Sequence, residues 1–134
     1  MSKEKLYIFD TTLRDGAQTQ GVDFSINDKQ KISASLDALG VDYIEGGWPG
    51  ANPTDTEFFN KDHNFKNSKL TAFGMTKKAE HSAENDPMLA SLINSKSSSV
   101  CLFGKSWDFQ VEVALGITNE QNLENISESA KHVI

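Results

Sequence analysis

The chain has 134 residues, 37% of them hydrophobic, which is enough for one domain with a modest core. Its formal net charge of −6 argues against a general nucleic-acid binder or a binder of anionic membranes, and no segment approaches the ~18 apolar residues of a membrane span. Cys101 is the single cysteine, which excludes an intrachain disulfide, and no apolar signal-peptide segment follows the charged N-terminus, so we expect a cytoplasmic protein.

The first predicted element is a buried strand over 6–10, because residues 6–9 are continuously apolar and favour β structure. A polar loop containing glycine covers 15–23. Ser25 and Asp28 then have the spacing of a capping box, which predicts the start of a helix, and Gly40 ends it. The apolar stripe expected on this helix consists of Ile32, Leu36 and Leu39.

Two further strand and helix pairs are predicted in the middle of the chain. A second strand over 41–45 is followed by a glycine-rich loop over 46–50 and a short helix over 53–61. A third strand over 70–74 precedes a third helix over 86–94, which has proline in its first turn. The apolar face expected on the third helix consists of Met88, Leu89, Leu92 and Ile93.

The last predicted elements are a fourth strand over 99–103, one or two helical turns over 107–115 and a final helix. Thr118 and Gln121 form a capping box that begins this helix. The residues expected to face inward from it are Leu123, Ile126 and Ala130.

This order of four strands alternating with helices predicts a parallel sheet with helices on its outer side. The strands start about 30 residues apart, the length of a βαβ unit. The pattern alone fits half of a barrel and a doubly wound sheet equally well. A (β/α)8 barrel takes about 250 residues, and the chain ends within a helical pattern at Ile134. We therefore expect the N-terminal portion of a longer protein.

Three chargeable side chains, Asp10, Arg14 and Asp15, follow the first predicted strand. Chemistry in parallel α/β folds lies at the carboxyl ends of strands. Arg14 could hold a carboxylate or carbonyl oxygen and stabilise an enolate or alkoxide. Asp15 offers the hard oxygen donor that Mg²⁺, Mn²⁺ or Zn²⁺ binds. The structural alternatives are a salt bridge from Arg14 to Asp10 or Asp15, and a turn or N-cap role for Asp15.

The segment 10–18, Asp-Thr-Thr-Leu-Arg-Asp-Gly-Ala-Gln, resembles the signature of the Claisen-condensing and lyase family of metal-dependent TIM barrels. This family contains isopropylmalate, homocitrate and citramalate synthases and hydroxymethylglutaryl-CoA lyases. The segments 41–50 and 103–108 most resemble the citramalate synthase branch. The resemblance implies an α/β fold in which 1–134 form the N-terminal half of a (β/α)8 TIM barrel, a partial catalytic domain.

The function implied by this resemblance is a metal-dependent acyltransferase that condenses acetyl-CoA with pyruvate in isoleucine and leucine biosynthesis. The divalent metal would be Mn²⁺, Mg²⁺ or Zn²⁺, and the full-length protein would be a homodimer. Three alternatives stay open: a 2-isopropylmalate synthase that uses 2-ketoisovalerate, a lyase that runs the carbon–carbon step in reverse, and a catalytically inactive fragment.

The resemblance also assigns catalytic and metal-binding residues. Arg14 and Glu45 are the catalytic residues, and Asp15 is the metal ligand. Glu45 ends the second predicted strand, and a buried carboxylate there must be paired, for which Arg14 is the natural partner. We expect Glu45 to orient Arg14, with a purely structural ion pair as the alternative. Family members complete the metal site with a His-x-His pair late in the barrel, and the three histidines of this chain form no such pair: His63, His81 and His132.

The residues expected to bind substrate are Arg14, Gln18, Phe73 and Ser106. Gln18 could hydrogen-bond the substrate or fix Arg14. Phe73 ends the third predicted strand, where a short apolar pair with Gly74 suits a small keto acid such as pyruvate; core packing is the alternative. Ser106 lies in the stretch after the fourth predicted strand that resembles the citramalate synthases.

Overall fold

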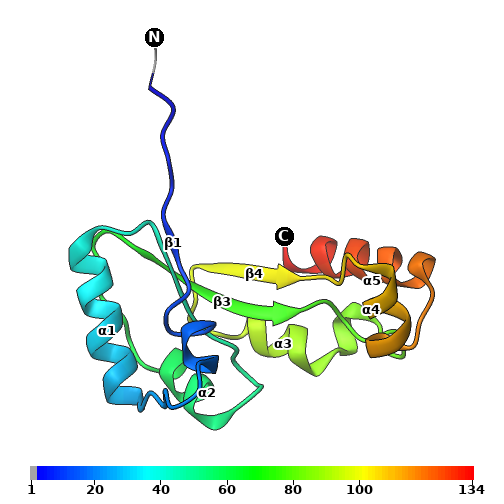
Figure 1. Cartoon of the computed structure of the whole chain (residues 1–134), viewed down its shortest axis with the longest axis horizontal. Helices are drawn as coiled ribbons and strands as arrows, with labels where there is room; N and C mark the ends of the chain where they lie inside the picture. Colours follow the sequence, from blue (N-terminus) through cyan, green and yellow to red (C-terminus); the bar gives the residue numbers. More distant parts are fainter. Residues whose placement is uncertain (1–2) are drawn as a thin grey trace.

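The computed structural model describes residues 3–134 and contains one four-stranded parallel sheet with the strand order β1-β2-β3-β4 (Figure 1). The strands are β1 Phe9–Asp10, β2 Tyr43–Gly47, β3 Lys69–Met75 and β4 Ser99–Phe103. Each strand pairs with the next one along the chain. This sequential winding is that of a barrel, whereas a doubly wound sheet reverses its strand order. The predicted α/β alternation and the barrel-type half are therefore confirmed.

Helices follow each strand at the predicted places. The α-helices are α1 Ile26–Leu39, α2 Pro53–Asn60, α3 Pro87–Ile93, α4 Asp108–Gln110 and α5 Asn119–Val133. The 3-10 helices are η1 Gly16–Gln18 and η2 Ala83–Asn85, and α4 continues into a π-helix, η3 Val111–Leu115. Both predicted capping boxes are present, at the starts of α1 and α5. Within residues 3–134, every helix is too short or too polar to cross a bilayer.

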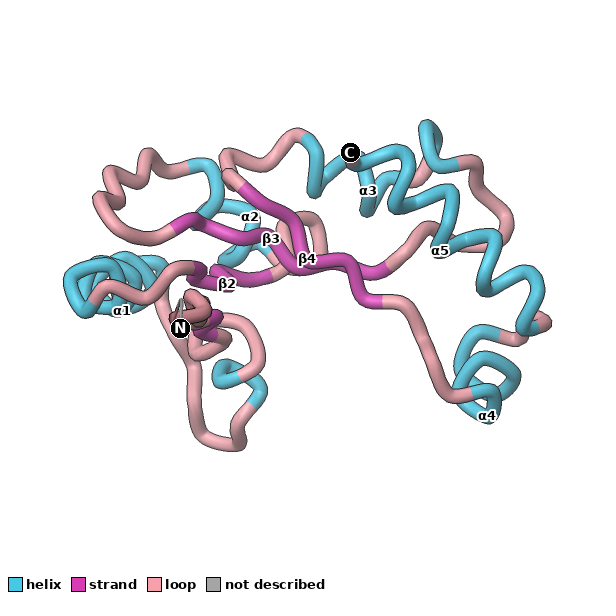
Figure 2. The backbone as a smooth tube through the Cα atoms, turned by 90° about the horizontal axis from the view of Figure 1, so that it is seen from above, coloured by secondary structure: helices cyan, strands magenta, loops and turns pink. Residues whose placement is uncertain are grey.

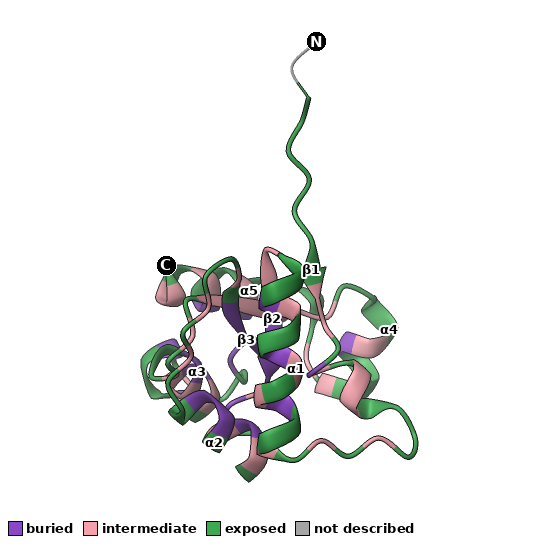
Figure 3. Ribbon diagram, turned by 90° about the vertical axis from the view of Figure 1, so that its left-hand side faces the viewer, coloured by how far each residue is buried: buried purple, intermediate pink, exposed green. Residues whose placement is uncertain are grey.

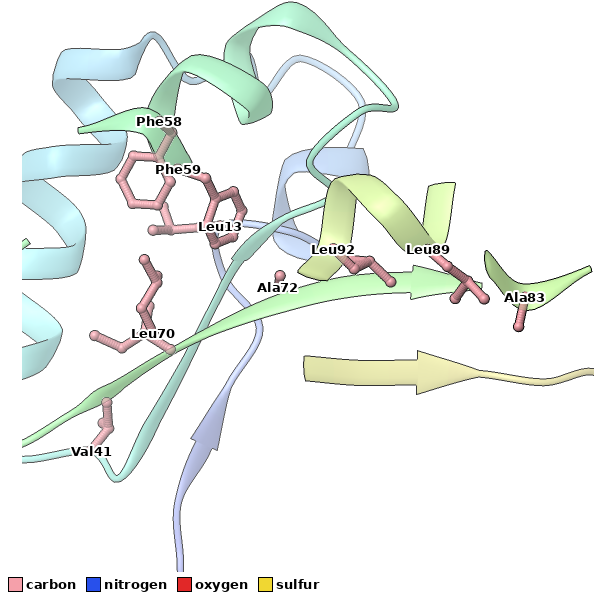
Figure 4. Packing of buried hydrophobic residues seen from close by; sticks show 10 residues of the cluster. Leu13, Val41, Phe58, Phe59, Leu70, Ala72, Ala83, Leu89 and Leu92 are labelled. Carbon is pink, nitrogen blue, oxygen red and sulfur yellow. The ribbon is translucent and has the colours of Figure 1, made fainter. Parts of the chain in front are cut away.

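A layer of helices covers one face of the sheet. In Figure 2, α3 and α5 lie on one side of the strands, and α4 lies beyond the ends of the strands. The main hydrophobic core fills the space between the sheet and helices α2 and α3 (Figure 4). Its fully buried members include Leu13, Ile44, Phe58, Phe59, Leu89 and Leu92. Burying such side chains contributes roughly 1.5–3 kcal/mol each, which makes this layer the main source of stability.

The predicted buried strand over 6–10 is wrong in length and in burial. Only Phe9 and Asp10 pair with β2, and the side chains before them are exposed, with Leu6 85% and Ile8 58% accessible. The segment stands away from the body of the molecule (Figure 3). The main chain of Ile8 still bonds to Asp42 and Tyr43. Composition predicts an extended backbone here, but burial requires a neighbour that the described part of the chain does not supply.

Three predicted inward-facing residues are also exposed: Leu39 of α1, Ile93 of α3 and Leu123 of α5. The helix α5 instead buries Asn122, Asn125 and Ser129. Polar burial there is possible because Lys77 lies beneath the helix, where its backbone N–H donates to Ser129 and its Nζ donates to Asn125. The predicted packing face is therefore confirmed for Ile32 and Leu36 of α1 and for Leu89 and Leu92 of α3, whereas α5 buries polar residues beside the predicted ones.

Candidate functional site

The two faces of the sheet carry different side chains because successive residues of a strand point to opposite sides. Ile44 packs in the core, so Glu45 points to the opposite face of the sheet. On β3 the same alternation separates Ala72 from Phe73, and the register pairs Phe73 with Cys101 of β4. The face away from the core thus brings together residues from three neighbouring strands.

The loop after β1 carries Arg14 onto this face. The carbonyl oxygen of Thr11 accepts hydrogen bonds from the backbone N–H groups of Arg14, Asp15 and Gly16, which turns the chain sharply. The carboxylate of Asp10 accepts hydrogen bonds from the backbone N–H and the hydroxyl of Thr12. Asp10 therefore shapes the loop and does not pair with Arg14.

Arg14 is held by two carboxylates and one aromatic ring. Its Nε donates to Oε2 of Glu45 at 2.7 Å, and its Nη1 donates to Oδ1 of Asp15 at 3.2 Å. Its Cζ lies 4.1 Å from the centroid of the Phe73 ring, within cation–π range. The Glu45 side chain is 1% exposed and that of Arg14 is 20% exposed. The predicted Arg14–Glu45 pair is present, and the Arg14 side chain remains partly accessible.

Phe73 both packs and lines the site. It is 9% exposed, and its ring contacts those of Trp48, at a centroid distance of 5.5 Å, and Phe103, at 6.2 Å. The ring therefore forms an apolar floor under the Arg14 guanidinium. Core packing of this residue is therefore confirmed, while its contact with a small keto acid stays a prediction.

Cys101 is a site neighbour that sequence reasoning missed. Burial raises the pKa of its thiol, and the negative charge of the nearby Glu45 carboxylate raises it further. The positive charge of Arg14 acts in the opposite direction but does not reverse the shift. The strand alternation on β4 was the signal that could have found it, because Cys101 is two residues before Phe103.

Asp15 is suited to bind a cation, but it is not part of a cluster of metal-binding side chains among the described residues. Its side chain is 64% exposed, and Oδ1 accepts the hydrogen bond from Arg14. Among residues 3–134, no three His, Cys, Asp or Glu side chains converge to hold a metal ion. Asp15 could thus supply one oxygen ligand to a cation.

Gln18 and Ser106 lie at different places around the sheet. Gln18 is exposed at the end of η1, where it helps to line a cavity of about 350 Å³ that Arg14 and Trp48 also border. Ser106 is exposed in the loop after β4. The structure therefore brings Gln18 next to Arg14, while no contact joins Ser106 to this group of residues.

A buried ion pair between Lys29 of α1 and Asp55 of α2 borders the same cavity. Lys29 is 3% exposed and Asp55 is 8% exposed. Gly47 permits this approach, because a Cβ there would lie 2.5 Å from Cγ of Asp55, and its φ of +144° disfavours other residues. Lys29 lies three residues before Ile32 on the packed face of α1, which is the sequence signal for its burial.

Comparisons with known proteins identify the family of the chain. The HMGL-like family model matches residues 5–133. An (R)-citramalate synthase from Aquifex aeolicus is 52% identical and covers 97% of this chain and 25% of the relative. A second one, from Sulfolobus acidocaldarius, is 46% identical and covers 99% of this chain and 26% of the relative. A 2-isopropylmalate synthase from Sulfurisphaera tokodaii is more distant at 32% identity, covering 98% of this chain and 33% of the relative.

A solved structure supports the fold. The hydroxymethylglutaryl-CoA lyase from Pseudomonas aeruginosa superposes with a TM-score of 0.68 at 18% identity, over 97% of this chain and 44% of the lyase. The chain spans about a quarter of the length of the citramalate synthases that it matches. From the family match over nearly its whole length and the signature residues gathered at Arg14, the chain belongs to the HMGL-like family.

Proposed function

We propose that this chain forms part of the active site of a citramalate synthase-like acyltransferase, which condenses acetyl-CoA with pyruvate and then hydrolyses the thioester. The observation that carries the proposal is the Arg14 guanidinium, oriented by a buried carboxylate at the carboxyl ends of parallel strands and partly accessible. The identity of 40–52% to five citramalate synthases supports pyruvate over larger keto acids.

Arg14 is proposed to bind the keto acid. An arginine has five N–H donors, and two of those of Arg14 are used by Glu45 and Asp15. The remaining donors can hold the carboxylate or the keto oxygen of pyruvate. As the acetyl enolate attacks the keto carbon, negative charge develops on that oxygen, and a fixed cation beside it stabilises the transition state.

Glu45 is proposed to orient Arg14 rather than to remove a proton. Its carboxylate already accepts a short, charge-assisted hydrogen bond from Arg14 and is 1% exposed. A base that deprotonates the acetyl methyl group must reach the substrate. We therefore place the base outside this chain.

Asp15 is proposed as one ligand of a divalent metal, Mn²⁺, Mg²⁺ or Zn²⁺, because its side chain is 64% exposed and Arg14 bonds to only one of its two oxygens, Oδ1. The bound metal would polarise the keto carbonyl. Arg14 would hold the Asp15 carboxylate in place through its Nη1. The residue that binds the metal and the residue that binds the keto acid would thus be joined by one hydrogen bond.

Three other residues are proposed to complete the substrate site. The buried ring of Phe73, under the guanidinium, limits the size of the keto acid and favours pyruvate. Gln18 would hydrogen-bond a substrate in the cavity next to Arg14. Ser106 would reach the substrate from the loop after β4. The full-length protein would act as a cytoplasmic homodimer in isoleucine and leucine biosynthesis.

Two alternatives remain candidates. A 2-isopropylmalate synthase would use the same chemistry on 2-ketoisovalerate, and relatives at 29–33% identity support it less strongly. The chain alone could also be inactive, since it supplies one metal ligand and spans about a quarter of its relatives.

A chimera tests the proposal. The matched segment of the citramalate synthase that is 52% identical would be replaced by this chain. Acetyl-CoA-dependent thiol release would then be measured with pyruvate and with 2-ketoisovalerate. We expect release with pyruvate, its loss on chelation of divalent metal, and its loss in the Arg14→Ala chimera.

Lys96→Ala provides the control, because Lys96 is exposed and pairs only with the exposed Asp62. It should leave the rate unchanged. If the chimera prefers 2-ketoisovalerate, the result would support the isopropylmalate synthase alternative instead. A folded chimera without activity on either acid would favour the inactive alternative.

A further inference from the structure

The buried ammonium of Lys29 contacts the main chain on both sides of the site. Its Nζ donates to the carbonyl oxygen of Leu13 at 3.0 Å and to that of Gly46 at 2.9 Å. The carboxylate of Asp55 is its third partner. A lysine ammonium has three donors, so all of them are used within the protein and none is left to bind a substrate.

The two carbonyl groups belong to the neighbours of the catalytic pair. Leu13 directly precedes Arg14, and Gly46 directly follows Glu45. The loop after β1 and the end of β2 are therefore joined twice. The Lys29 ammonium links their backbone carbonyl groups, and the hydrogen bond between Arg14 and Glu45 links their side chains. One charged group thus sets the distance between the two backbones from which the catalytic side chains extend.

The position of the ammonium is itself fixed. Asp55 accepts hydrogen bonds from the backbone N–H of Trp48 and from Nδ2 of Asn52, both at 2.9 Å. These contacts hold the carboxylate at the start of α2, and the carboxylate compensates the charge of Lys29. A buried ammonium that lacked this partner would be strongly unfavourable.

We propose that Lys29 is a positioning residue that sets the geometry of the Arg14–Glu45 pair through the backbone on either side of it. The inference rests on the proposed function in one respect, namely that Arg14 is the group that binds the keto acid. Its structural part requires no substrate and can be tested separately.

Arg14 is the only arginine in the chain, so its Nε–Hε group gives a single NMR signal. In the wild-type chain this proton is bonded to a buried carboxylate, and the signal should be protected from exchange with water. Removing both charges in Lys29→Met/Asp55→Asn avoids an uncompensated buried ion. We expect the folded double variant to lose this protection, with the Arg14 signal moving toward that of a free arginine side chain.

Lys77→Met is the matched control. Lys77 is also buried, at 7% exposure, and donates to the backbone carbonyl of His81 and the side-chain oxygen of Asn125. It also forms an ion pair with Glu128. Its removal should leave the Arg14 signal unchanged. A double variant at 29 and 55 that folds with an unchanged Arg14 signal would overturn the inference.

If the double variant does not fold, a measurement on the wild-type chain still tests the inference. Hydrogen-bond couplings from Nζ of Lys29 to the carbonyl carbons of Leu13 and Gly46 are expected, and their absence would also overturn the inference. Pyruvate binding by the chimera separates the two proposals. If Arg14→Ala leaves that binding unchanged, the proposed function fails, while the response of the Arg14 signal to the Lys29 variant, measured in the chain alone, is unaffected by that result.

Discussion

Nε of Arg14 donates a hydrogen bond to Oε2 of Glu45 at 2.7 Å, although 31 positions separate the two residues in the chain. The bond joins the loop after β1 to the end of β2. Because the Glu45 side chain is 1% exposed, water does not compete for its charge. The pair therefore contributes to the fold as well as to the candidate site.

The first prediction concerns the stability of this pair. Glu45→Gln keeps the shape of the side chain but replaces a charge-assisted hydrogen bond by a neutral one, which should lower the free energy of unfolding by about 2 kcal/mol. Urea denaturation measures the change. Glu57→Gln is the control: its ion pair with Lys61 is exposed, and about 0.5 kcal/mol or less is expected. Equal losses in the two variants would contradict this account.

The second prediction concerns the reactivity of Cys101, the single thiol of the chain. Because burial and the Glu45 carboxylate raise its pKa, alkylation by iodoacetamide should be slow near pH 8 and should accelerate only at higher pH. Glu45→Gln removes the second cause, so the pKa of the thiol should fall while staying above its ordinary value. The pH dependence of the alkylation rate gives both values. An unchanged profile in the variant would mean that Glu45 does not act on the thiol.

The third prediction concerns Gly47. An added Cβ would lie 2.5 Å from Cγ of Asp55 at a φ of +144°, so Gly47→Ala should disrupt the contact between β2 and α2. Gly21→Ala is the matched control, because Gly21 also has a positive φ, +83°, but nothing lies within 4 Å of the added atom. The control should lose about 1 kcal/mol from backbone strain alone. The Gly47 variant should lose clearly more in the same urea titration.

The fourth prediction concerns pH-dependent stability through Asp37. Its carboxylate accepts hydrogen bonds from the backbone N–H groups of Lys66, Asn67 and Ser68, which hold its pKa below the ordinary value of 3.8. A carboxyl whose pKa is lower in the folded state adds stability above its unfolded pKa, and this stability is lost as the pH falls through the folded value. Asp37→Asn should therefore be less stable than wild type near neutral pH, and the difference should shrink below about pH 4.

Thermal unfolding of both proteins across this pH range provides the test. Ser35→Ala is a suitable control, because Ser35 lies on the same helix and its hydroxyl bonds only to the exposed backbone of Lys31. A difference between wild type and Asp37→Asn that stays constant with pH would exclude the proposed origin.

The sequence by itself determined the elements that depend on local chemistry. Both capping boxes, the starts of α2 and α3 at proline, and the bounds of β4 depend on residues within a few positions of each other. The Arg14–Glu45 pair was also predictable, because a carboxylate at a buried strand end needs a cation and the adjacent loop holds the only arginine.

Only the tertiary structure decided which residues find partners across the fold. The apolar segment over 6–8 is exposed because no second strand lies beside it in the described chain, and Leu123 is exposed because α5 packs through its polar face onto Lys77. Lys29 and Cys101 joined the site through contacts with residues 16 or more positions away. The periodicity of a sequence shows that a helix or strand has two different faces. Which face is buried depends on the part of the chain that packs against it, and only the tertiary structure shows that packing.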